Sequence, residues 1–238
     1  MNTWAWVSWL GMDPDGWGVA LLQGALVTLE ISLGAFVSGL VLGMLGAAAK
    51  LSNVHVLQRI AQIYTTLCRA VPELLLILLL YYAGTDAVNL LMTAVGIGPV
   101  NVNGFATAVV VLGVVQGAYA AEIIRGAILA IPYGQIEAGR AFGGSPSLVF
   151  RRVILPAMAP YALAGLANLW LILIKESALI SVVGYNELLS TAKQAASSTR
   201  QYLYYYLLVA AIYFVITKVS NQLFRRIERR FGRWMPSS

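Results

Sequence analysis

The sequence has few of the residues that build catalytic or metal centres. Its single cysteine, Cys68, excludes an intrachain disulfide and a cysteine metal cluster, and its one histidine, His55, cannot form a zinc site alone. No serine-hydrolase elbow, metalloprotease helix motif or Walker-type phosphate loop occurs in the 238 residues. We therefore expect no catalytic residue and no metal site, and we expect that the chain cannot bind ATP through a P-loop of its own.

Charged residues are also scarce. They make up 11% of the chain, whereas a soluble domain has about 25%, and hydrophobic residues make up 59%. This composition indicates an integral membrane protein embedded in the lipid bilayer. The net charge of +6 does not point to nucleic acid, because the sequence has no basic groove interleaved with aromatic stacking positions.

What the chain has in abundance is apolar runs, and five are long enough to cross a bilayer as helices, which takes about 20 residues. The predicted spans are residues 21–49, 60–83, 105–131, 158–183 and 202–219. The second carries Arg69, Pro72 and Glu73 near its start, so it can alternatively be an interfacial segment up to Ala70 followed by a span from Pro72. We predict a single all-α transmembrane domain with about five spanning helices.

Basic residues are distributed unevenly between the two sides of the predicted membrane domain. They follow the first span, the third span and the last span, at Lys50, Arg59, Arg69, Arg125, Arg140, Arg151, Arg152, Lys218, Arg225, Arg226, Arg229, Arg230 and Arg233. The first twenty residues contain no basic residue, and their charged residues are Asp13 and Asp15. By the positive-inside rule we expect a periplasmic N-terminus, a cytoplasmic C-terminus and a cytoplasmic loop at about 132–157.

Five charged residues lie inside or near the spans: Glu30, Glu73, Glu122, Lys175 and Glu176. Charges at this depth are costly and usually face a protein interior or a water-filled path, so they are functional candidates. Arg69 and Glu73 are four residues apart, which favours a structural ion pair on one helix face. Glu122 can either pair with Arg125 or line a path, and Glu30 has no partner nearby in sequence.

Small residues recur at helical spacing in the first span. Gly39 and Gly43 form a GxxxG pattern, with Gly34 and Gly46 close by. This spacing indicates close packing of helices in a bundle rather than ligand binding.

The polar segment QIEAGRAFGGSPSLVFRRVILP, residues 135–156, interrupts the apolar runs. Pro132 can begin a short helix, and Gly143 with Gly144 can end it. Ser145 and Pro146 can start a second short helix, which we expect Pro156 to stop. The residues therefore predict two short helices joined by a glycine hinge at the membrane surface.

This segment also matches a known pattern, EAA-x3-G-x9-I-x-LP. The matching residues are Glu137, Ala138, Gly139, Gly143, Val153, Leu155 and Pro156, with glycine at 139 in place of alanine and valine at 153 in place of isoleucine. The pattern resembles the cytoplasmic coupling motif of permease subunits of bacterial ABC importers.

The resemblance extends over nearly the whole chain through GALVTLEISL, TTLCRAVPELLL, QGAYAAEIIRGAILAIPYGQIEAGRAFG and IKESALISVVG. These stretches resemble the polar amino-acid uptake family, above all the Q-type subunits of the histidine and lysine–arginine–ornithine permeases and the related arginine, octopine and nopaline permeases. The resemblance implies a type I ABC importer permease (MetI-like) fold in the bacterial inner membrane.

The resemblance also implies partners. They are a second permease subunit of the M-type in a hetero- or homodimer, two ATP-binding subunits that carry ATP and Mg²⁺, and a periplasmic solute-binding protein. Coupling to the ATPase is implied for Glu137, Ala138, Gly139, Gly143, Leu155 and Pro156.

We therefore predict a permease that moves a polar, basic amino acid by alternating access. Glu30 and Glu122 are candidates for an acidic substrate path, and Tyr119, Trp170 and Lys175 are further lining candidates. The alternatives are an opine or neutral polar amino-acid permease and, in a different class, a passive channel or membrane scaffold that needs no coupling lever. A membrane enzyme is disfavoured because nucleophile and metal motifs are missing.

Overall fold

The computed structural model describes residues 16–98 and 103–231, and within these ranges the chain is helical with no strand. Asp13, Asp15, Arg233 and the side chain of Arg230, all used above for orientation, lie outside the described residues. The helices are α2 Gly18–Leu51, α3 His55–Ala70, α4 Glu73–Ala94, α5 Gly104–Leu129, α6 Tyr133–Ala141, α7 Pro146–Val149, a π-helical turn η1 Phe150–Ile154, α8 Leu155–Glu176, a 3₁₀ turn η2 Ser177–Val183, α9 Leu188–Thr199 and α10 Tyr202–Phe231.

Five helical segments of the described residues are long and apolar enough to cross a membrane. They are Gly18–Leu51, Glu73–Ala94, Gly104–Leu129, Pro146–Val183 and Tyr202–Arg229. The predicted fold class, an all-α membrane protein with about five spanning helices, is confirmed.

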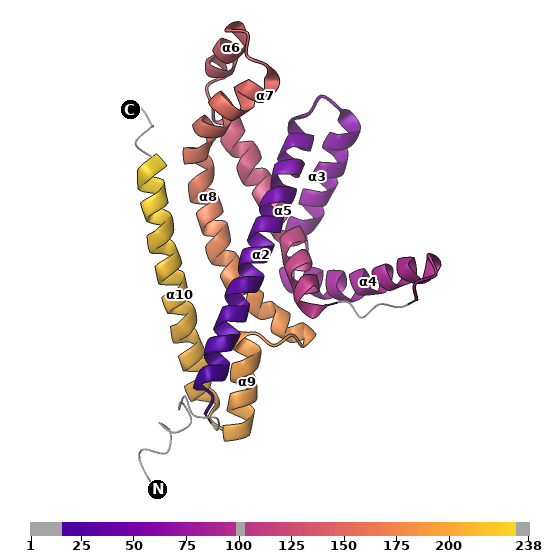
Figure 1. The fold of residues 1–238 in the computed structure, drawn as a ribbon, viewed down its shortest axis with the longest axis vertical. Helices are drawn as coiled ribbons and strands as arrows, with labels where there is room; N and C mark the ends of the chain where they lie inside the picture. The colour runs from indigo at the N-terminus through magenta and orange to yellow at the C-terminus, as the bar shows by residue number, and fades with distance from the viewer. Residues whose placement is uncertain (1–15, 99–102, 232–238) are drawn as a thin grey trace.

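The long helices α2 and α5 pack closely along each other at the centre of the fold (Figure 1). A Cβ atom added at Gly43 of α2 would lie 2.5 Å from the Cβ of Ala120 on α5, closer than carbon atoms can approach. Both Ala120 and its neighbour Ala121 are fully buried in this contact. The GxxxG pattern of the first span thus brings α2 against another helix of the same chain, in agreement with the predicted packing role.

The predicted second span, residues 60–83, contains a helix break. Helix α3 ends at Ala70, and Val71 is extended (φ −93°, ψ 140°) before Pro72 and the start of α4. The cause is Pro72, which lacks an N–H and forces the residue before it out of the helical region. The apolar candidate span is α4 rather than residues 60–83.

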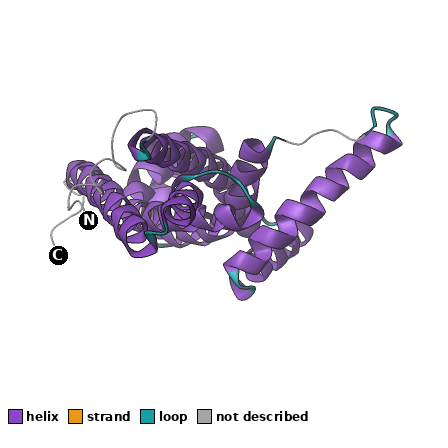
Figure 2. Ribbon diagram, turned by 90° about the horizontal axis from the view of Figure 1, so that it is seen from below, coloured by secondary structure: helices purple, strands orange, loops and turns teal. Residues whose placement is uncertain are grey.

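Helix α4 leaves the rest of the molecule after this break. It runs across the direction of α2 and α5 in Figure 1, and it extends away from the other helices in Figure 2. Ile77 is its one fully buried residue, while large apolar side chains such as Leu79, Leu90 and Leu91 are more than half exposed. The helix therefore presents an apolar surface that the rest of the chain does not cover.

The helix after Ser145 does not stop at Pro156, contrary to the sequence-based expectation. Helix α7 continues through the π-helical turn Phe150–Ile154 into α8, so Pro156 lies in the first turn of α8. Pro156 has no backbone N–H to donate, and the π turn before it shifts the backbone hydrogen-bond pattern, so the helix continues past the proline. The polar segment is therefore joined to the fourth candidate span, Pro146–Val183, without a break.

The two ends of the bundle differ. Helices α6 and α7 and the C-terminal end of α10 lie at one end, and the start of α2 and α9 lie at the other (Figure 1). The basic helix-end residues Lys50, Arg140 and Arg151 thus belong to segments at the end that carries α6 and α7, which is the distribution that the positive-inside rule associates with the cytoplasm.

A buried carboxylate holds α9 in place. Glu187 is 0% exposed and accepts hydrogen bonds from the backbone N–H groups of Leu189 (2.9 Å) and Ser190 (2.8 Å) in the first turn of α9. The hydroxyls of Thr28 on α2 (3.2 Å) and Tyr213 on α10 (3.1 Å) also donate to it. Burial raises the pKa of the Glu187 carboxyl, and these four donors oppose that shift.

Replacing this carboxylate should destabilise the fold, because it leaves donors on three helices unpaired. We expect Glu187→Ala to lower the midpoint of thermal unfolding in detergent by at least about 5 °C, since each buried unpaired polar group costs about 1–3 kcal/mol. Glu137→Ala, a change at an exposed glutamate of α6, is the control and should leave the midpoint unchanged. Equal midpoints for both variants would contradict the anchoring role.

Candidate functional site

The polar segment forms a helical hairpin that projects from one end of the bundle (Figure 1). Helix α6 ends in a pair of backbone hydrogen bonds, from Gly144 N–H to the Gly139 carbonyl (3.2 Å) and from Gly143 N–H to the Arg140 carbonyl (2.9 Å). This pattern is a Schellman motif, which requires a left-handed residue at its first position after the helix. Gly143 supplies it with φ of +76°.

Close packing across the hairpin depends on its other small residues. A Cβ at Gly144 would lie 2.6 Å from the Gly139 carbonyl oxygen, and a Cβ at Gly139 would lie 3.1 Å from Val153. The glycine that departs from the EAA pattern at 139 therefore lets α6 approach the turn that follows α7. Ser145 caps the start of α7, since its hydroxyl accepts from the Leu148 N–H at 3.3 Å.

The outer surface of the hairpin is exposed and mixed in character. Phe142 at its tip is 93% exposed, and the predicted coupling residues Glu137, Ala138, Leu155 and Pro156 are exposed as well. An exposed aromatic ring at the tip of a rigid hairpin is typical of a surface that another protein covers.

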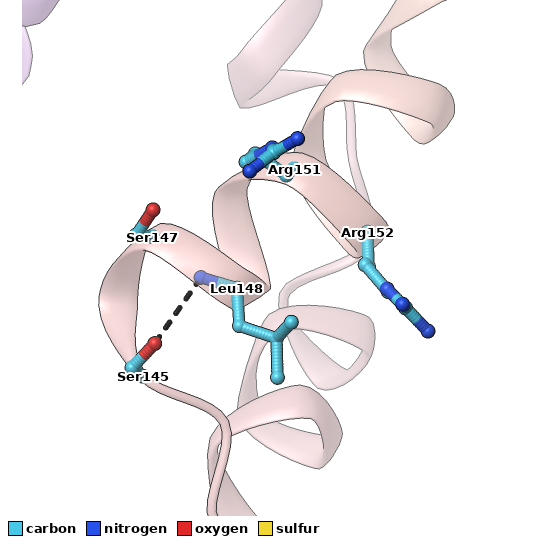
Figure 3. Close-up of a pocket in the computed structure, with 5 residues that line it drawn as sticks. All are labelled: Ser145, Ser147, Leu148, Arg151 and Arg152. Atoms are coloured by element: carbon cyan, nitrogen blue, oxygen red, sulfur yellow. Dashed lines mark hydrogen bonds between the residues drawn. The ribbon is translucent and has the colours of Figure 1, made fainter.

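A shallow cavity of about 380 Å³ lies beside this surface, lined by Ser145, Ser147, Leu148, Arg151 and Arg152. Figure 3 shows Arg151 and Arg152 extending in different directions from the same turn, with the Ser145 cap below them. The two guanidinium groups therefore do not converge on one point, and they suit separate contacts on an extended surface.

A second polar region runs through the membrane domain between α2, α3, α4, α5 and α8. We call it the polar seam, and its members are Lys50, Arg69, Glu73, Gln116, Tyr119, Glu122, Arg125 and Glu176. Because charged and polar side chains are expensive inside a bilayer, a row of them on adjoining helices marks an interior or a path rather than a lipid-facing surface.

The first half of the polar seam is acidic. The Gln116 amide nitrogen donates to the Glu176 carboxylate, and Glu73 from the start of α4 interacts with both Glu176 and the Tyr119 hydroxyl. Two carboxylates that interact repel each other when both are charged, so a cation bound beside them would be stabilised.

One hydrogen-bonding atom of Gln116 has no partner in the described part of the chain. It is only 1% exposed, yet its Oε1 atom has no hydrogen-bond partner among the described residues. A buried amide oxygen without a donor carries a desolvation cost of about 1–3 kcal/mol. A donor group arriving beside Glu176 would remove that cost, which makes this position suited to an N–H-bearing ligand.

The second half of the polar seam is basic and is organised by one carboxylate. Glu122 accepts from Lys50, whose side chain is 5% exposed, and from Arg125 at 3.0 Å, and it lies 3.9 Å from Arg69. Arg69 also stacks over the Tyr119 ring at 6.0 Å, which connects the two halves.

This arrangement corrects the predicted Arg69–Glu73 ion pair. The helix break at Val71 and Pro72 places the two residues on different helices, so the expected spacing of one helical turn is lost. Arg69 turns to Glu122, and Glu73 turns to Glu176 and Tyr119.

The remaining path candidates lie outside the polar seam. Glu30 is exposed on α2, and no ion pair or hydrogen bond joins it to another described residue. Trp170 packs edge-on against Phe36 at 5.3 Å and near Phe224 at 6.5 Å, so it fastens α8 to α2 and α10. Lys175 is exposed and contributes only a charge near Glu176.

Two members of the polar seam were missed by sequence reasoning. Gln116 is an isolated polar residue in an apolar run, a signal that could have found it, whereas Lys50 was read only as an orientation signal. Among the described residues no group of three histidine, cysteine, aspartate or glutamate side chains could hold a metal ion.

Comparison with known proteins identifies the family of this chain. A family model described as a binding-protein-dependent transport system inner membrane component matches residues 39–233. The chain belongs to this family. It is thus a permease subunit of an ABC transporter, as the EAA-like segment predicted.

Individual relatives of the permease agree with this assignment. It is 45% identical over 222 residues to the octopine transport system permease protein OccQ of Rhizobium radiobacter, covering 93% of this chain and 94% of the relative. It is 39% identical over 217 residues to the histidine/lysine/arginine/ornithine transport system permease protein HisQ of Escherichia coli K12, covering 91% and 95%.

A solved structure agrees as well. A crystal structure of an amino acid ABC transporter with histidines contains a chain that is 30% identical, with a TM-score of 0.78 and coverage of 97% of this chain and 99% of that one. The permease therefore has the MetI-like fold that the resemblance implied.

Proposed function

We propose that this permease moves basic amino acids, of the arginine, lysine, ornithine and histidine type, across the bacterial inner membrane by alternating access. The observation that carries the proposal is the acidic half of the polar seam. Glu176 interacts with Glu73 and accepts from the amide nitrogen of buried Gln116, whose Oε1 has no partner among the described residues, and these oxygens would accept the N–H groups of a guanidinium or ammonium. The name of the relative HisQ, which is a permease for such amino acids, supports it.

The exposed hairpin supports the proposed source of energy. We propose that α6, with Glu137, Ala138 and Gly139, seats in a separate ATP-binding subunit that binds ATP and Mg²⁺. Since Gly143 fixes the hairpin and α7 continues into α8 without a break, a push on α6 would be transmitted to a spanning helix. Two such subunits and a periplasmic solute-binding protein would complete the importer.

The exposed apolar surface of helix α4 supports the proposal of a second membrane subunit. Its apolar side chains are exposed and the rest of the described chain does not cover them. In the proposed importer an M-type permease, or a second copy of this chain, packs there. The predicted orientation, with the N-terminus periplasmic and the C-terminus cytoplasmic, remains part of this proposal.

An opine permease is the second candidate. The relative OccQ is named for octopine, and opines of this kind carry an additional carboxylate beside a guanidinium group. The basic half of the polar seam, with Arg69, Lys50 and Arg125 around one carboxylate, offers the positive charge that such a substrate needs.

Uptake into proteoliposomes that contain the complete importer and its binding protein would test the proposal. We expect ¹⁴C-arginine to accumulate only when ATP is enclosed on the ATPase side, and excess lysine or ornithine to compete. Arginine flux without ATP would overturn the importer assignment in favour of a passive channel. Competition by octopine but not by lysine would favour the opine permease, and competition by glutamine alone would exclude both.

A further inference from the structure

A cavity of about 450 Å³ lies where the end of α2, the first turns of α3 and the end of α5 meet. It is lined by Lys50, Gln58, Arg59, Gln62 and Arg125. These helix ends lie at the end of the bundle that carries α6 and α7 (Figure 1). Gln62 is seven residues beyond the start of α3, or about 10 Å along the helix, so the cavity lies within about two helical turns of this end of the bundle.

The cavity is electropositive. Three cationic side chains line it, and no carboxylate is among its five lining residues. The nearest acidic group, Glu122, binds Lys50 and Arg125 and neutralises only one charge of the three. Among the described residues no ion pair includes Arg59, so this guanidinium has its full set of donors available for a ligand.

Helix α3, which contributes to the cavity, also carries a row of exposed apolar side chains. Four large apolar side chains follow one another along α3 at intervals of three or four residues and are 56–65% exposed: Val56, Ile60, Ile63 and Leu67. We call Val56, Ile60, Ile63 and Leu67 the apolar ridge. It adjoins the polar face of α3 that carries Arg59 and Gln62.

We propose that this cavity binds the phosphate of an anionic phospholipid, whose acyl chains lie along the apolar ridge. A basic pocket between membrane helices at the interface is the usual receptor for such headgroups, and an adjoining exposed apolar row fits the chains. A free anion would use the cations and leave the ridge uncovered. The proposal does not depend on which substrate the permease moves.

Native mass spectrometry of the full-length chain, purified in mild detergent with the subunits that copurify, tests this directly. Phosphatidylglycerol and phosphatidylcholine are titrated separately, and inorganic phosphate is added as a competitor. We expect preferential retention of phosphatidylglycerol, and Arg59→Gln should weaken its apparent affinity about fivefold, since one basic residue contributes about 1 kcal/mol near a charged lipid. Millimolar phosphate should compete only weakly because it cannot use the ridge.

Three variants make the outcome specific. Gln62→Glu, which adds a negative charge to the cavity without removing a cation, should also weaken phosphatidylglycerol binding. Arg226→Gln, at an exposed arginine of α10, is the matched control and should keep the wild-type affinity. Ile60→Ser on the apolar ridge should weaken lipid binding while leaving any binding of phosphate unchanged.

Some results would overturn the proposal. If Arg59→Gln and Arg226→Gln reduce binding equally, the lipid responds to general charge and not to this cavity. If phosphate displaces the lipid completely, the site is one for a free anion. If Arg59→Gln leaves lipid binding intact and instead releases a copurifying subunit, the cavity is a protein contact.

Discussion

Gly143→Val should abolish coupled transport while leaving the permease in the membrane. Gly143 has φ of +76°, a conformation that costs an L-residue about 1–2 kcal/mol and a β-branched residue more, so valine would unwind the end of α6. In the proposed importer α6 is the part that the ATP-binding subunit moves. We expect ATP-dependent uptake to fall at least tenfold, with the amount of permease in membrane fractions unchanged.

Gly143→Asn is the control for this experiment. Asparagine tolerates the left-handed region and adds a polar side chain where open space surrounds the residue, so it should keep most of the uptake. Equal loss in the two variants would show that the turn geometry is not what matters. Normal uptake by the valine variant would contradict the role of the hairpin in coupling.

The hairpin was well predicted from sequence because its signals are local. Proline at 132, glycine at 143 and the Ser145–Pro146 cap specify their own backbone conformations, and the structure has a short helix, a left-handed turn and a capped turn in those places. The one local error, a helix stop at Pro156, arose because a proline in a first turn can be accommodated when the preceding turn widens to a π helix.

The polar seam was poorly predicted because its contacts are not local. Glu122 meets Lys50 across 72 positions of sequence, and Gln116 meets Glu176 across 60. Periodicity indicates which residues share a helix face but not which helices are neighbours. The sequence therefore predicts an ion pair between residues four apart, such as Arg69 and Glu73, and cannot identify a partner on another helix. Glu73 shows the consequence: a proline break moved it from Arg69 to Glu176.

Glu176→Gln should reduce transport of cationic substrates most strongly. The change keeps the size of the side chain and its contact with Gln116 but removes the charge that, in the proposed path, faces the guanidinium or ammonium. A hydrogen bond to a charged group contributes about 1.5–3 kcal/mol, so we expect arginine uptake to fall about tenfold or more. Uptake of any neutral substrate that the importer accepts should fall less.

Glu30→Gln provides the matched comparison, because it makes the same chemical change at an intramembrane glutamate that lies outside the polar seam. If the acidic half of the polar seam is the path, arginine uptake should keep its wild-type rate in Glu30→Gln and drop in Glu176→Gln. The reverse order would move the path to the exposed face of α2. Neutralising Glu122 is a weaker test of the path, since it would leave the buried Lys50 ammonium without its partner and disturb the fold itself.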